Sequence, residues 1–146
     1  MLFVYGTLQD PDVLAAILGR AVDVTRLPQL LAPGYRAVTY PGRVYPALVK
    51  APGHDAPGLG LDTLSTLDHA ALDAFEGDEY RRGTLHVVHD GQLLEADAYF
   101  PVAAIAVDGP SWSLDDWTRR HKRAVIGAEV ETASALRNRL SAARSD

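Results

Sequence analysis

The 146-residue sequence contains no cysteine. Disulfide scaffolds, zinc fingers, iron–sulfur clusters and thiol nucleophiles are therefore excluded. No stretch approaches the roughly 20 apolar residues of a membrane-spanning helix. The apolar start Met1–Tyr5 is too short for a signal peptide, and no Lys or Arg precedes it. We therefore expect a soluble, cytoplasmic protein with no membrane partner.

Basic side chains are also in the minority. The chain has 14 Lys and Arg against 19 Asp and Glu, a formal net charge of −5. Phosphate contacts need a basic face, so nucleic acid is not an expected partner. The nucleophile elbow, the Walker loop and the H-E-x-x-H zinc motif are absent. His86 and His89 fall on opposite faces of a predicted strand, so we predict no metal site.

Capping residues mark the start of the first two predicted helices. Asp10 and Pro11 suit the N-cap and first position of a helix that ends near Gly19. Ser65 and Asp68 stand at capping-box spacing, which predicts a helix over residues 65–77.

Strand-like runs fill most of the space between these helices. The hairpin signal Asp90-Gly91 separates two of them. The segment 53–57 is read as an exposed turn, and Tyr99 falls on a face predicted to be wet. Without a regular βαβ alternation, the fold class is α+β in one domain, residues 1–146. The predicted strands are 2–5, 35–39, 44–50, 58–63, 84–89 and 93–100.

The C-terminal region, residues 111–144, is predicted to be helical. Ser113 is its N-cap, and the region is one helix or two separated at Gly127. We expect it to pack over the rest of the chain through Trp112 and Trp117, with a pocket mouth or a dimer contact as alternatives. Its predicted apolar stripe is Trp117, His121, Ala124, Val125 and Ala128, continued after Gly127 by Ala133, Leu136 and Leu140.

Two segments could carry chemistry. In Tyr5-Gly6-Thr7-Leu8 a buried strand opens into a loop whose N–H groups and hydroxyl can hold an anion, although a simple turn fits equally. Glu76 follows the apolar face of its helix, so burial would raise its pKa toward the range useful for proton transfer. The alternative for Glu76 is an exposed carboxylate paired with Arg81 or Arg82.

The run Phe3-Val4-Tyr5-Gly6-Thr7-Leu8 resembles the signature loop of the γ-glutamylcyclotransferase-like proteins, the AIG2-like group. The segment from Leu72 to Arg82 resembles the second signature of that family, and Tyr45-Pro46-Ala47-Leu48-Val49 resembles the strand between them. The resemblance covers residues 2–100. It implies a small mixed β-barrel with peripheral helices, and a pocket where the first loop and Glu76 meet.

The resemblance also implies roles for individual residues. Glu76 corresponds to the catalytic acid/base of the family. Tyr5, Gly6, Thr7 and Leu8 correspond to the substrate-binding loop, and Tyr80 to a hydroxyl in the pocket wall. Tyr45, Pro46 and Arg82 correspond to supporting residues. Gly60-Leu61-Asp62-Thr63 departs from the Gly-Glu-x-Tyr that is frequent in the family, so a second pocket carboxylate is not expected there.

The implied activity needs no cofactor. The α-amine of a γ-glutamyl amine or γ-glutamyl amino acid attacks its own γ-carbonyl, which releases 5-oxoproline and the attached amine. The alternatives are a module of the same fold that binds a small molecule without turnover, or an interaction domain that works through the C-terminal helix.

Overall fold

The computed structural model describes residues 1–145, which form five strands, four α-helices and three short 3₁₀ turns. The strands are β1 (Leu2–Val4), β2 (Gln29–Thr39), β3 (Pro46–Leu61), β4 (Tyr80–His89) and β5 (Gln92–Pro101). The α-helices are α1 (Pro11–Leu18), α2 (Thr66–Glu76), α3 (Leu114–Arg120) and α4 (Lys122–Ser145). The 3₁₀ turns are η1 (Thr7–Gln9), η2 (Val24–Arg26) and η3 (Gly77–Glu79).

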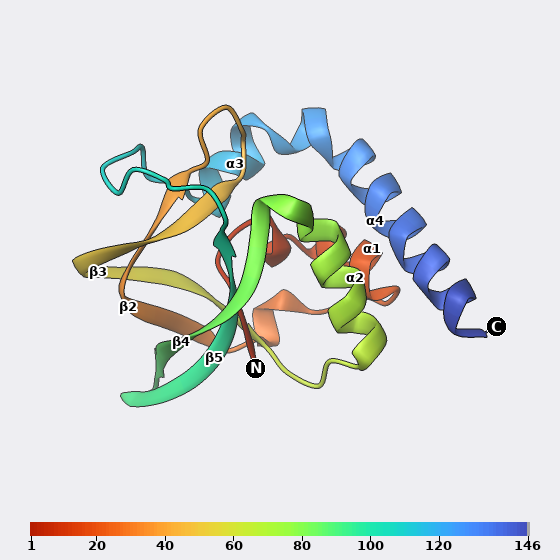
Figure 1. Cartoon of the computed structure of the whole chain (residues 1–146), viewed down its shortest axis with the longest axis horizontal. Coiled ribbons are helices and arrows are strands. Elements are labelled where there is room, and N and C mark those ends of the chain that lie inside the picture. The colour runs from red at the N-terminus through yellow and green to blue at the C-terminus, as the bar shows by residue number, and fades with distance from the viewer. Residues whose placement is uncertain (146) are drawn as a thin grey trace.

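The strands close into a barrel in the order β1-β3-β2-β4-β5. Strand β1 is antiparallel to β3 and parallel to β5, so the barrel is mixed. Helices α1, α2 and α4 lie together on one side of the barrel, and α3 lies near one of its ends (Figure 1). The predicted α+β class with a small mixed barrel and peripheral helices is confirmed.

Strand β1 is buried on both faces. Phe3 and Tyr5 point into the barrel core, whereas Leu2 and Val4 join a second core beneath the helices. A strand covered on both faces has no wet side, and this explains the uninterrupted apolar run at the start of the sequence. Strand β1 ends at Val4, so the loop that follows it, from Tyr5 to Leu8, begins at one end of the barrel.

The predicted turn over residues 53–57 is wrong, because β3 runs through this segment. The pairing with β2 shifts register between Pro33 and Tyr35, which absorbs extra residues of β3 as an irregular bulge. Gly53 adopts a positive φ of 86° there. His54 and Asp55 are exposed, as the composition of the segment indicated. The two strands predicted at 44–50 and 58–63 are therefore parts of one long strand.

The hairpin of β4 and β5 is confirmed, with its turn at Asp90 and Gly91, which both have positive φ. The predicted wet position of Tyr99 is wrong, since only 4% of this residue is exposed. Its ring packs in the core beneath the helices, and its hydroxyl donates to the Asp73 carboxylate on α2 at 2.6 Å. The outer face of β5 is wet only where no helix covers it.

The C-terminal region forms two helices that separate at His121 rather than at Gly127. Trp117 is 1% exposed and packs in the core beneath the helices, as predicted. Ala133 is buried in the same core, and Val125 and Leu140 pack against it, so this part of the predicted stripe is confirmed. Ala124 and Ala128 are exposed, so their predicted place in the stripe is wrong.

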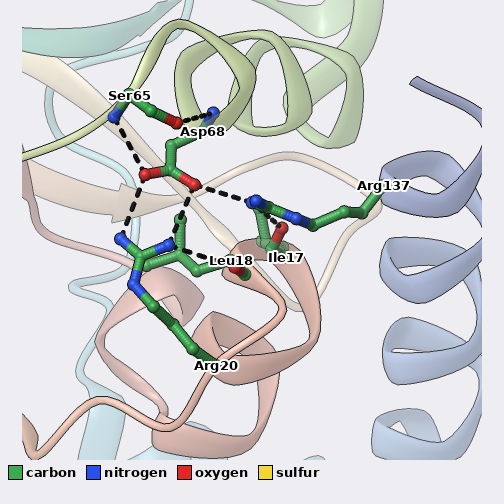
Figure 2. Close-up of polar contacts among 6 residues, drawn as sticks. All are labelled: Ile17, Leu18, Arg20, Ser65, Asp68 and Arg137. Carbon is green, nitrogen blue, oxygen red and sulfur yellow. Dashed lines mark hydrogen bonds and ion pairs between the residues drawn. The ribbon is translucent and has the colours of Figure 1, made fainter. Parts of the chain in front are cut away.

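A buried carboxylate joins the helices on their side of the barrel (Figure 2). Asp68, in the first turn of α2, is 1% exposed. Arg20, just after α1, donates two hydrogen bonds of 3.0 Å to its two oxygens, and Arg137 of α4 donates one of 2.7 Å. The Ser65 N–H adds a capping-box bond of 2.9 Å. Every oxygen of the buried carboxylate is thus matched by donors.

Asp68 stays ionised at neutral pH because of these donors. Burial alone would raise the pKa of Asp68, but the hydrogen bonds from Arg20, Arg137 and Ser65 outweigh it and hold the pKa far below its usual range. A carboxyl whose folded pKa is depressed contributes stability above its unfolded pKa of about 4. That contribution is lost as the pH falls below this value.

We predict that Asp68→Asn lowers the free energy of unfolding by about 3 kcal/mol, since it leaves two guanidinium groups without their buried partner. Urea denaturation at neutral pH measures this. The matched control is Asp115→Asn, which removes an exposed ion pair on α3 and costs no more than about 0.5 kcal/mol. The difference between Asp68→Asn and wild type should shrink below pH 4; a constant difference would contradict the assignment.

Candidate functional site

A cavity of about 260 Å³ opens where the first loop, the end of α2 and the start of β3 meet. Its size suits a small molecule rather than a macromolecule. Nearly all residues that the sequence assigned to the site line this cavity. They are Tyr5, Gly6, Thr7, Leu8, Tyr45, Pro46, Glu76 and Tyr80.

The first loop forms one wall. Gly6 is packed against Pro46, and a Cβ at this position would lie 2.9 Å from the Pro46 Cγ, closer than real Cβ atoms come to a neighbour. The loop then enters η1, whose opening amides have no acceptor within the turn. Within residues 1–145, the backbone N–H groups of Gly6, Thr7 and Leu8 donate no hydrogen bond to another residue. These amides lie beside the cavity and can bind an anionic or carbonyl oxygen.

Glu76, the last residue of α2, contributes a carboxyl group to the same cavity. Burial raises its pKa to about 8, with a second contribution from the negative charge of Glu129. Within the described residues it forms no ion pair. The alternative that Glu76 pairs with Arg81 or Arg82 is therefore wrong, and Arg82 binds Asp73 instead, at 3.3 Å.

Tyrosines form another part of the cavity lining. Tyr80 donates to the carbonyl oxygen of Pro46 at 2.6 Å, and Tyr45 donates to the Glu79 carboxylate at 2.7 Å. The rings of Tyr40, Tyr45 and Tyr80 contact one another with centroids about 6 Å apart. Burial is the main cause that raises the pKa of Tyr45, to about 12, and it also raises that of Tyr80. Both hydroxyls therefore stay protonated at neutral pH.

Tyr5 closes the inner end of the cavity. It is 7% exposed, and its hydroxyl donates to the carbonyl oxygen of Tyr99. Burial raises the pKa of Tyr5 well above the usual value, with a further contribution from the charge of Glu76. The hydroxyl is thus an anchor between β1 and β5, and it holds the start of the first loop in place.

Arg82 is the only sequence-assigned residue that does not line the cavity. It contacts the Asp73 carboxylate and the His69 ring on the outer face of α2. Asp73 in turn accepts the hydrogen bond from Tyr99. Arg82 therefore fixes α2 against the β4–β5 hairpin, in agreement with a supporting role.

The sequence reasoning missed Glu129. This residue lies on α4 and lines the cavity, and its negative charge contributes to the raised pKa of Glu76. No motif marks it, since it is one acidic residue on a polar helix distant in sequence from both signatures.

Leu61, which stands where the family pattern has Glu, is 3% exposed and does not line the cavity. The neighbouring Asp62 is exposed, and its carboxylate lies 3.8 Å from the Met1 amine. The cavity carboxylates other than that of Glu76 belong to Asp78, Glu79 and Glu129.

Metal-ligand geometry is not found at this site. Over residues 1–145, no group of three or more His, Asp or Glu side chains is arranged to hold a metal ion. Nor does any helix in that range combine the length and apolar character needed to cross a membrane.

The chain matches a known family over most of its length. The model of the family described as "Gamma-glutamyl cyclotransferase, AIG2-like" matches residues 2–119. AIG2-like protein A of Arabidopsis thaliana is 30% identical over 127 residues, which cover 85% of this chain and 75% of that protein. AIG2-like protein B of the same plant is 27% identical over 148 residues, covering 99% and 84%.

A solved structure agrees with this relationship. The solution structure of an Arabidopsis thaliana protein superposes with a TM-score of 0.63 at 30% identity, covering 87% of this chain and 85% of that one. The signature loop, the buried Glu76 and the barrel thus occur together in a chain that the family model spans almost completely. This protein belongs to the AIG2-like γ-glutamyl cyclotransferase family.

Proposed function

We propose that this protein is a γ-glutamyl cyclotransferase, which converts a γ-glutamyl amide into 5-oxoproline and a free amine in the cytoplasm. The observation that carries the proposal is Glu76, a half-buried residue without an ion-pair partner among the described residues, which shares one cavity with the amides of the first loop. Family membership supports the reaction class.

The reaction is an intramolecular acyl transfer. The α-amine of the glutamyl group attacks the γ-carbonyl carbon, the C–N bond to the leaving amine breaks, and the α-nitrogen loses a proton while the leaving nitrogen gains one. Both reactants are in one molecule, so the protein supplies the folded conformation, which is a proximity effect. We assign this role to the walls formed by the first loop, Pro46 and Tyr80.

Glu76 moves the proton. The ionised carboxylate accepts a proton from the attacking amine, and the resulting acid donates it to the leaving nitrogen. A carboxyl with a pKa near 8 suits both steps at neutral pH, because neither protonation state is strongly favoured. The amides of Gly6, Thr7 and Leu8 are placed to hold the α-carboxylate or the oxyanion that develops on the γ-carbonyl.

We predict that Glu76→Gln lowers turnover by about 10²-fold or more, since the amide cannot carry the proton. The measurement is 5-oxoproline release from γ-glutamyl amines and γ-glutamyl amino acids, with circular dichroism to verify folding. Glu95→Gln, an exposed change on β5, is the control. Near-normal release from Glu76→Gln would refute the assignment, and binding without release by the wild type would indicate a binding module.

The pH profile gives an independent check. We predict that kcat/KM rises with pH to a midpoint near 8, because free Glu76 must lose its proton before it can act as a base. In Glu129→Gln the neighbouring negative charge is gone, so the pKa of Glu76 falls and the rising limb moves to lower pH. A limb that does not move would show that the two carboxyl groups are not coupled.

A third prediction concerns the first loop. Gly6→Val places a side chain against Pro46, and the resulting displacement of the loop should lower kcat/KM about tenfold or more, mainly through KM. Gly127→Val is the control, since a Cβ at that exposed position of α4 meets no neighbour. Unchanged kinetics in a folded Gly6→Val protein would show that the first loop does not bind the substrate.

A further inference from the structure

The turn between β2 and β3, residues 40–45, brings one side chain to the cavity. Its last residue, Tyr45, lines the cavity, whereas residues 41–43 are exposed. Within the turn, the Arg43 N–H donates to the Tyr40 carbonyl oxygen at 2.9 Å, and the Tyr40 N–H donates to that of Tyr45 at 3.0 Å. A short exposed turn opens easily unless other elements hold it. The position of Tyr45 therefore depends on contacts from outside the turn.

One such contact joins the turn to the segment that follows Glu76. Glu79 accepts a hydrogen bond from the Tyr45 hydroxyl at 2.7 Å and one from the Arg43 guanidinium at 3.2 Å. Half of the Arg43 side chain and a third of the Glu79 side chain are exposed. Ion pairs that reach solvent contribute little stability. This contact orients the Tyr45 hydroxyl, but it leaves the backbone of the turn to be held by another residue.

Trp112 makes the second contact, and this one holds the backbone. The segment before α3 lies along the end of β2, where the Thr39 N–H donates to the Pro110 carbonyl oxygen at 2.8 Å. The Trp112 N–H donates to the Ala37 carbonyl oxygen at 3.1 Å. From this anchored position the indole N–H of Trp112 donates to the Val44 carbonyl oxygen at 2.8 Å. The turn, in orange, accordingly lies beside the chain that leads into α3 (Figure 1).

The ring of Trp112 is fixed as well as its backbone. It packs against the core beneath the helices, as the Val44 side chain does. An indole has one N–H and no acceptor, so the bond to Val44 uses its whole capacity for hydrogen bonds. The donor is therefore rigid, and the carbonyl group that it binds directly precedes Tyr45 in the chain.

We propose that Trp112 is a positioning residue for this cavity, because it holds the turn so that Tyr45 stands in the cavity wall before a ligand binds. This inference rests on the proposed function of the cavity. A wall that is already ordered increases affinity, since the ligand does not have to order it. Trp112 does not itself line the cavity, so it acts through the turn. Its loss should raise KM, whereas kcat, which depends on Glu76, should change little.

The first experiment measures amide hydrogen exchange in the free protein. Trp112→Phe removes the indole N–H and keeps an aromatic ring. We expect the Arg43 amide, which is bonded within the turn, to exchange about fivefold faster, the effect of one lost hydrogen bond. The Asp10 amide, which is bonded to the Thr7 carbonyl oxygen, should keep its wild-type rate. Equal acceleration of both amides would mean a loss of global stability and would overturn the inference.

The second experiment measures KM and kcat with the γ-glutamyl amide or γ-glutamyl amino acid from which the wild type releases 5-oxoproline fastest. We expect Trp112→Phe to raise KM about fivefold and to leave kcat within about twofold of wild type. The matched control is Trp117→Phe, the same change in the core beneath the helices, which should lower stability but keep the wild-type KM. An unchanged KM in Trp112→Phe overturns the inference but leaves the cyclotransferase function; absence of Glu76-dependent release overturns both.

Tyr45→Phe tests whether Trp112 acts through the turn. This change removes the hydroxyl that binds Glu79, so the turn loses its other attachment. If the turn transmits the effect of Trp112, the double variant should raise KM by less than the product of the two single effects, because residues in one network couple. A KM equal to that product would mean that the two residues act independently, and the inference would be wrong.

Discussion

The ion cluster around Asp68 is the interaction on which the arrangement of the helices depends. A barrel of five strands can close by itself, but the helices are joined to one another by side chains, and Asp68 binds both α1 and α4 from α2. Its carboxylate is almost completely buried, so its charge is tolerated only because two guanidinium groups are present. Glu76 ends the helix that Asp68 begins, roughly 12 Å along its axis. The same cluster therefore fixes the position of α2, which carries Glu76, relative to α4, which carries Glu129.

Helix α2 shows how environment separates two identical chemical groups. Asp68 and Glu76 are both carboxyl groups removed from water, yet their pKa values move in opposite directions. At Asp68, donors from Arg20, Arg137 and Ser65 outweigh the cost of burial. At Glu76, burial raises the pKa and the negative charge of Glu129 raises it further, with no donor to oppose them. A structural carboxylate and a proton carrier are thus distinguished by their neighbours and not by their residue type.

The sequence predicted those features that depend on neighbouring residues. The capping residues Asp10, Ser65 and Ser113 each begin a helix at the expected position, because capping is a local hydrogen bond. Features that depend on distant segments were missed. Tyr99 was predicted to be exposed because no feature of its own strand indicates that a helix covers that position. The length of β3 was hidden by glycine and proline around Gly53, which a bulge accommodates.

The candidate site divides in the same way. Contiguous motifs located Glu76, the first loop and Tyr80, since the resemblance is carried by short segments. Glu129 is on α4, which reaches the cavity only through tertiary packing, and no local pattern indicates that this residue lines the cavity with Glu76. The position of α4 is set by contacts with α1 and α2 such as the bond from Arg137 to Asp68.

The position of α4 has a consequence for the cavity. The family model matches residues 2–119, and α4 begins after that, at Lys122. The groups assigned to bond making and breaking therefore lie within the matched residues, whereas Glu129 of α4 lies beyond them. A substitution at residue 129 alters the lining of the cavity without changing any residue of the strands or of the signature loop.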